Sequence, residues 1–262
     1  MNIIDAARRG EPLNDILIID CHCHMGSWHN FNIPCNSAEG MLKSMDTLGI
    51  NTVCVTGLAS IGPDYRYGND MVMRAVLKYP DRFIGYVTLN PHYQEDMQHE
   101  IDRCFAVKGF LGIKLHPNFH GCEIDDKLYH IAYQAAEKRK CHMLIHTWGK
   151  ADIDNVNKIA GQYSGIFFII GHAGGDIKGM RKAIDVVNSH NNVYVDLALS
   201  TTFEGNVEWL VNEVGSKKIL YGSDMPFFDP RSTVGRIAFS DISDDEKLDI
   251  FGLNMKKILK WV

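Results

Sequence analysis

Residues 17–24 read Leu-Ile-Ile-Asp-Cys-His-Cys-His, an apolar run that passes directly into alternating cysteines and histidines. Short apolar runs of this kind recur along the whole chain. Most are apolar on both faces, as are parallel strands buried between a core and a layer of helices. The eight runs lie at 17–21, 52–56, 83–88, 112–115, 143–146, 166–170, 193–196 and 219–221.

Helical patterns separate these runs, at 37–48, 69–78, 95–107, 127–138, 153–160, 177–189 and 207–214. One strand and its crossover helix recur about every 29 residues, and eight such units close naturally into a barrel. The sequence therefore predicts an α/β fold, a single-domain (β/α)8 TIM barrel over residues 1–262. The alternative, an open doubly wound sheet, usually has a glycine fingerprint after its first strand, where this chain has residues 21–24 instead.

Composition excludes several classes of protein. With 45% hydrophobic and 23% charged residues in 262, the chain is typical of a soluble globular protein. A net charge of −5 without a basic run argues against a nucleic-acid partner. Apolar stretches of about five residues, against the roughly twenty that span a bilayer, argue against a membrane protein. Charges in residues 1–20 and seven cysteines without a Cys-x-x-Cys pair predict a cytoplasmic protein.

The first run ends in a candidate metal site. Side chains two apart on a strand share a face, so Asp20, His22 and His24 are expected on one face and Cys21 and Cys23 on the other. Two imidazoles at a strand end can bind one metal ion, and Asp20, one layer deeper, is expected to orient a ligand from behind. The alternative is a pair of structural histidines bonded to neighbouring carbonyls.

Three further runs end in groups that suit a hydrolytic zinc centre, namely His146, His172 and Asp224. In a barrel the carboxyl ends of all strands meet at one rim, where barrel enzymes place their active sites. This coincidence favours a functional site over separate structural residues. Asp196, at the end of the seventh run, is a second candidate for supporting a ligand from behind.

Other side chains near the same rim are candidates for substrate binding. Lys114, in the fourth run, suits a substrate carboxylate or a developing anion, and His116 shares its face. Trp28, Trp148 and Phe227 are expected to wall the pocket, with plain packing as the alternative.

The order of these motifs resembles the amidohydrolase superfamily, in its aminocarboxymuconate semialdehyde decarboxylase-like branch. The resemblance extends from Asp20 to Asn254. It implies a barrel enzyme that binds a divalent metal ion and acts on a small molecule, and relatives in this branch often form dimers. A homodimer is therefore one expectation.

Carried over position by position, the resemblance implies His22, His24, His146 and Asp224 as metal ligands. His172 would then act on water or substrate, although other branches bind a metal at that strand. Three nitrogens and a carboxylate suit Zn²⁺, with Mn²⁺, Fe²⁺ or Co²⁺ as alternatives.

Lys114 decides the number of ions, because binuclear relatives carboxylate the lysine of this strand and bridge two metals with it. A second ion is expected only if Lys114 is carboxylated. Unmodified, the lysine remains an ammonium beside the metal.

Three functions are compatible with these residues. The first is a hydrolase whose metal-activated water cleaves an amide, ester or lactone, with Asp224 moving the proton and His172 stabilising the transition state. The second keeps the site but decarboxylates or hydrates an unsaturated or aromatic carboxylate bound by Lys114. The third, a non-catalytic barrel that binds metal or ligand, is disfavoured because the catalytic groups are present.

Overall fold

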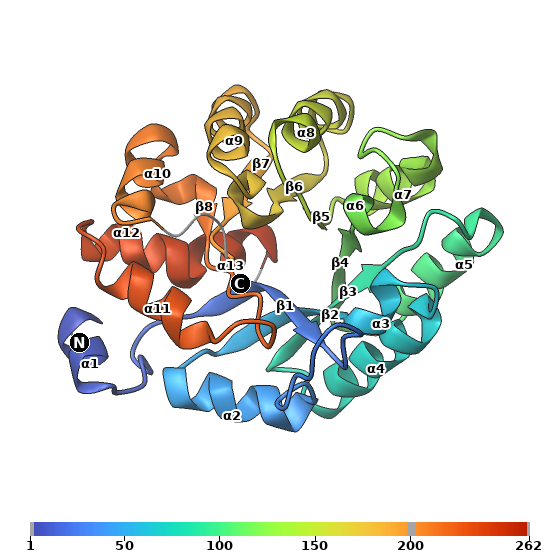
Figure 1. Ribbon diagram of the computed structural model, residues 1–262. Coiled ribbons are helices and arrows are strands. Elements are labelled where there is room, and N and C mark those ends of the chain that lie inside the picture. The colour runs from blue at the N-terminus through green and yellow to red at the C-terminus, as the bar shows by residue number, and fades with distance from the viewer. Residues whose placement is uncertain (1–2, 199–202, 261–262) are drawn as a thin grey trace.

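The computed structural model describes residues 3–198 and 203–260. Its eight strands form one parallel sheet in the order β1 to β8, which curls into a barrel with helices outside it (Figure 1). The predicted TIM-barrel fold is confirmed. The strands are β1 (Ile19–Met25), β2 (Thr52–Gly57), β3 (Phe83–Thr88), β4 (Phe110–Leu115), β5 (His142–Ile145), β6 (Phe167–Ile170), β7 (Val193–Asp196) and β8 (Ile219–Leu220).

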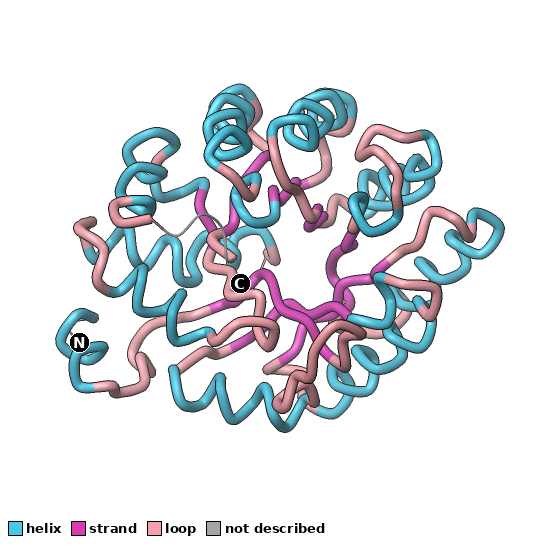
Figure 2. The backbone as a smooth tube through the Cα atoms, viewed as in Figure 1, coloured by secondary structure: helices cyan, strands magenta, loops and turns pink. Residues whose placement is uncertain are grey.

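Helices surround the strands, as Figure 2 shows in cyan around magenta. None of the described helices combines the length and the apolar character that crossing a bilayer requires. The α-helices are α1 (Ile3–Arg9), α2 (Ala38–Leu48), α3 (Leu58–Ile61), α4 (Tyr65–Lys78), α5 (Gln94–Phe105), α6 (Pro117–His120), α7 (His130–Arg139), α8 (Lys150–Gln162), α9 (Ile177–Ser189), α10 (Asn206–Val214), α11 (Pro230–Ala238), α12 (Asp244–Leu248) and α13 (Asn254–Ile258).

Main-chain hydrogen bonds between β1 and the segment at and after β8 close the barrel. The Cys21 N–H donates to the Tyr221 carbonyl at 2.9 Å, and the His24 N–H donates to the Met225 carbonyl at 2.7 Å. The first and last strand ends, which the sequence separates most widely, therefore lie side by side at one rim.

The apolar core has two layers. One lies between the strands and the surrounding helices, and the other fills the barrel, where α13 contributes Met255 and Ile258 to the same cluster. The barrel interior includes Ile19, Cys21, Cys54, Ile84, Tyr86, Leu144, Ile169 and Leu220.

The alternation predicted for β1 is wrong at Cys21. The register of β1 against β2 runs from Asp20↔Val53 to Cys23↔Val55, so β1 carries one extra residue. This bulge turns Cys21 into the barrel interior, whereas Cys23 packs in the outer layer. Asp20 lies behind the rim, where its Oδ1 accepts hydrogen bonds from the main-chain N–H groups of His22 and Ser223, both at 3.1 Å.

Candidate metal centre

Three of the predicted ligands meet where β1 adjoins the segment after β8. The coordinating atoms of His22, His24 and Asp224 all lie within 4.8 Å of one another. Asp224 Oδ1 is 2.8 Å from His24 Nε2 and 3.8 Å from His22 Nε2. The Asp224 N–H donates to the His22 carbonyl at 2.8 Å, so the closure of the barrel itself positions the carboxylate.

The orientation of Asp224 fits a bound cation. Its Oδ1 is buried and makes no hydrogen bond of acceptable geometry, although His24 Nε2 is within hydrogen-bond distance. A buried carboxylate oxygen without a hydrogen bond is costly. Two imidazole nitrogens and a carboxylate oxygen that converge in this way form a donor set that suits a divalent metal ion.

Neighbouring side chains orient both imidazoles. His22 Nδ1 lies 2.9 Å from Asp196 Oδ2, so the ring donates from Nδ1 and directs the Nε2 lone pair toward the cluster. His24 Nδ1 lies 2.7 Å from Thr56 Oγ1. Such contacts behind a ligand hold its tautomer and ring orientation. Asp196 therefore lies where the sequence predicts, whereas Thr56, at the end of the second predicted strand, was missed.

Burial sets the charges of these groups. It lowers the pKa of His22 well below its usual value, and the Lys114 ammonium lowers it further. Burial raises the pKa of Asp196 to about 6. Burial alone would also raise the pKa of Asp224, but His24, His22 and His172 hold it well below its usual range. The lowered pKa values favour the neutral imidazoles of His22 and His24, and the low pKa of Asp224 favours its carboxylate, which are the forms that bind a metal.

His146 and His172 form a second pair beside this cluster, with His146 Nδ1 3.0 Å from His172 Nε2. His172 Nδ1 donates to the Ala198 carbonyl at 3.0 Å, and Asp196 Oδ1 accepts the His172 main-chain N–H at 2.9 Å. The cluster of three does not include His146, whose ring stacks on His116 at 3.9 Å. Its predicted role as a ligand remains a prediction.

Lys114 lies beneath the floor of the site. It is completely buried, and its Nζ is 3.0 Å from His22 Nε2. Burial lowers the pKa of its ammonium to about 8. A positive charge is therefore held next to the ligand atoms, at the position where a carboxylate at the floor of the pocket would be stabilised.

A cavity of about 320 Å³ opens above these groups. His24, Asp224, His116, His146 and His172 form its polar part. The predicted aromatic walls Trp28, Trp148 and Phe227 line it, together with Phe31, Ile61 and Phe228, which the sequence analysis missed.

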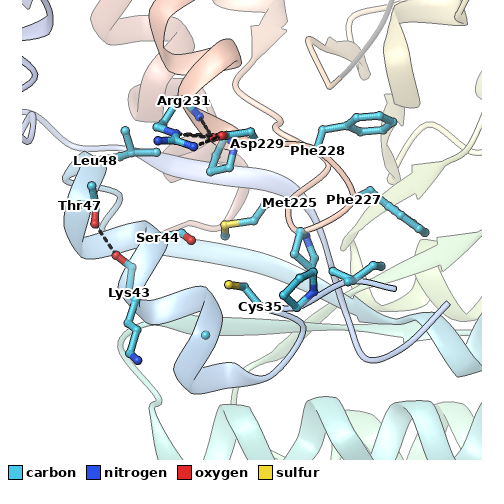
Figure 3. Close-up of a pocket in the computed structure, with 15 residues that line it drawn as sticks. Cys35, Lys43, Ser44, Thr47, Leu48, Met225, Phe227, Phe228, Asp229 and Arg231 are labelled. Atoms are coloured by element: carbon cyan, nitrogen blue, oxygen red, sulfur yellow. Dashed lines mark hydrogen bonds and ion pairs between the residues drawn. The ribbon is translucent and has the colours of Figure 1, made fainter. Parts of the chain in front are cut away.

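A second cavity, of about 420 Å³, lies between α2 and residues 225–231 (Figure 3). It shares Phe227 and Phe228 with the first cavity, and Figure 3 shows both rings turned away from Lys43 and Thr47. Two groups of the described residues could hold a metal ion, namely His22, His24 and Asp224, and His22, His172 and Asp196, and neither group lines this second cavity. The reactive groups therefore belong to the first cavity.

A family model for amidohydrolases matches residues 19–261. The chain belongs to the amidohydrolase family. The match includes all eight strands and every predicted site residue, so this amidohydrolase carries its candidate metal centre within the family domain.

Two curated proteins resemble this amidohydrolase along most of its length. It is 24% identical over 237 residues to a 2-amino-3-carboxymuconate-6-semialdehyde decarboxylase of Dictyostelium discoideum, covering 74% of this chain and 66% of that protein. It is 23% identical over 240 residues to a 2-keto-4-carboxy-3-hexenedioate hydratase of a Sphingobium strain, covering 72% and 69%. The chain thus spans about two thirds of the length of both relatives.

A solved structure shows the same fold. The 5-carboxyvanillate decarboxylase of Novosphingobium aromaticivorans, complexed with manganese and a nitrobenzoic acid, superimposes with a TM-score of 0.73 at 16% identity, covering 95% of this chain and 97% of that one. The barrel fold is therefore shared with this decarboxylase.

Proposed function

We propose that this enzyme catalyses the metal-dependent, nonoxidative decarboxylation of an unsaturated or aromatic carboxylate. The observation that carries the proposal is a floor of histidines and one aspartate beneath flat aromatic walls. The decarboxylases of Dictyostelium and Novosphingobium support it, and the related hydratase keeps hydration of such an acid as the second candidate. These relatives support hydrolysis of an amide, ester or lactone less well.

His22, His24 and Asp224 would hold the metal ion. When bound, a divalent ion supplies a Lewis acid that polarises an oxygen of the substrate. Mn²⁺ is our first candidate because the Novosphingobium enzyme binds it, and Zn²⁺ also suits the donor set.

Decarboxylation replaces a carboxyl group by hydrogen, so a proton must reach the carbon that loses carbon dioxide. Asp224 is a poor proton donor, because its pKa lies well below the usual range and it remains a carboxylate. We assign the transfer to Nε2 of His172, which lines the pocket. Because Nδ1 keeps the hydrogen that it donates to the Ala198 carbonyl, His172 would give up the Nε2 proton from its doubly protonated form and be left as a neutral imidazole. Lys114, buried just below, would hold its positive charge beneath the floor on which the acid group lies.

The test is a product assay on the manganese-loaded enzyme. We expect release of carbon dioxide from 2-hydroxybenzoates or unsaturated monocarboxylates, and no acid release from matched esters, amides and lactones. His172→Gln should bind metal normally but lose at least a hundredfold in kcat, the scale of general acid catalysis. Turnover of the esters or lactones without carbon dioxide release would overturn the proposal. Consumption of an unsaturated acid without carbon dioxide release would identify a hydratase.

A further inference from the structure

We infer that the outer half of the catalytic cavity is a subsite for an apolar group, so that the substrate is a monocarboxylate whose far end carries no charge. The inference rests on the proposed function, which places the carboxylate at the floor. It adds the chemistry of the other end of the substrate.

Aromatic rings form a continuous surface above the floor. The Phe227 ring lies 5.5 Å from Trp28 and 5.6 Å from Phe31, measured between ring centroids, and 5.2 Å from the imidazole of His24. The surface therefore begins at a metal-ligand candidate and runs outward without a polar interruption along these contacts. Planar apolar groups pack well on rings arranged at such distances.

Three of the rings that line the outer half of the cavity remain partly open to water. Phe31 is 49% exposed, Trp148 is 52% exposed and Phe228 is 38% exposed, although all three line the cavity. Apolar surface that borders a pocket usually marks a site that a ligand covers. A ligand that reached these rings would remove them from water, and each buried methylene would tighten binding roughly fourfold.

Charge restricts what can occupy this surface. Among the described residues that line the cavity, the ionisable groups are Asp224 and four histidines, and Lys114 lies just below them. The described residues that form the walls above this floor include no lysine, arginine, aspartate or glutamate. The internal segment outside the described ranges, residues 199–202, is Leu-Ser-Thr-Thr and contains no ionisable side chain. A second carboxylate packed against these rings would therefore lose water without gaining a charged partner, which is costly.

Binding measurements on the manganese-loaded protein test this subsite independently of turnover. The probes are 4-methyl-, 4-ethyl- and 4-propylbenzoate and benzene-1,4-dicarboxylate, titrated by calorimetry. We expect the dissociation constant to fall roughly fourfold for each added methylene, and the dicarboxylate to bind at least tenfold more weakly than 4-methylbenzoate. Equal affinity for the dicarboxylate, or no gain along the alkyl series, would overturn the inference.

A charge introduced at the mouth should reverse this preference. Because Phe31 and Phe228 are partly exposed, Phe31→Arg or Phe228→Arg should fold. Each variant should bind the dicarboxylate at least tenfold more tightly than the wild type, and its affinity should no longer rise along the alkyl series. Phe239→Arg is the matched control, because Phe239 is 53% exposed and lies outside the cavity lining.

Sedimentation of the same variants tests the alternative that these rings form a subunit interface. If both Phe31→Arg and Phe228→Arg change the oligomeric state and leave ligand preference unchanged, the rim is a subunit interface and the inference fails. If the binding series holds but no acid releases carbon dioxide, the subsite stands and only the proposed decarboxylation fails.

Discussion

His24 Nε2 and Asp224 Oδ1 face each other at 2.8 Å across the seam where the first strand meets the end of the last. Main-chain hydrogen bonds on both residues hold this approach, and Asp224 adopts a positive φ of 61° to make it. A strained main chain is maintained only where surrounding contacts demand it. Closure of the barrel therefore also brings the candidate metal ligands together.

Removing one of these ligands should remove the metal. His24→Gln cannot offer an imidazole nitrogen, so we expect the variant to lose its bound ion on dialysis while its circular dichroism spectrum stays unchanged. Metal content is measured by mass spectrometry of the dialysed protein. His99→Gln, an exposed histidine on α5, is the control and should retain the ion. Full metal occupancy in His24→Gln would contradict the assigned site.

Asp196 should act on the metal through His22. Because its carboxylate accepts the Nδ1 hydrogen at 2.9 Å, Asp196→Asn would weaken the hold on the ring and the basicity of Nε2. Changes behind a metal ligand typically cost 10-fold to 100-fold in affinity, and we expect that range from competition with a chelator. Asp185→Asn, on the exposed side of α9, should leave affinity unchanged. An unaltered affinity in Asp196→Asn would show that the carboxylate only supports the main chain.

The repeat of apolar runs was sufficient to predict all eight strands, because a parallel sheet buried on both faces needs such runs. The strand ends also revealed His22, His24 and Asp224, which the structure brings together. The bulge at Cys21 was not predictable in this way, since periodicity assumes an unbroken register.

The outer pocket could not be derived from the sequence for a different reason. Phe31 and Phe228 lie on irregular segments whose path depends on contacts with distant loops, and no spacing rule relates them. Asp20 shows the same limit, because its hydrogen bond to Ser223 depends on how the first and last strands meet.

Weak acid should destabilise the metal-free protein through the buried His142. Burial lowers the pKa of His142 to about 3, whereas an unfolded histidine titrates near pH 6.5. Between these values the unfolded state binds a proton that the folded state does not, so the free energy of unfolding falls as pH drops below about 6.5. Above that pH, His142 contributes no pH dependence.

The variant His142→Phe isolates this effect. The ring packs against Tyr86, and its Nε2 has no hydrogen-bond partner, so phenylalanine loses no bond at this atom. From pH 7.5 to 5.5 we expect the wild type to lose about 1.4 kcal/mol more than the variant, measured by urea unfolding. His99→Phe serves as the surface control. Parallel losses in wild type and His142→Phe would show that His142 does not carry the linkage.

Lys114 has two possible roles, as an ammonium below the floor or as a carboxylated bridge between two ions, and substitution separates them. Its Nζ, 3.0 Å from His22 Nε2, is close enough for either role, and the His146–His172 pair beside it could receive a second ion. Lys114→Met keeps the length of this buried side chain but removes its charge. If the ammonium stabilises the substrate anion, kcat should fall by about a hundredfold while one bound ion remains.

Metal counting with and without bicarbonate decides between these roles, because bicarbonate supplies the carbon dioxide that carboxylates a lysine. We expect one ion per chain in the wild type under both conditions and one in Lys114→Met, since the ligands His22, His24 and Asp224 are untouched. Removing a positive charge next to Nε2 should, if anything, tighten metal binding. Two ions in bicarbonate-treated wild type, falling to one in Lys114→Met, would instead establish the bridge and assign His146 and His172 to the second ion.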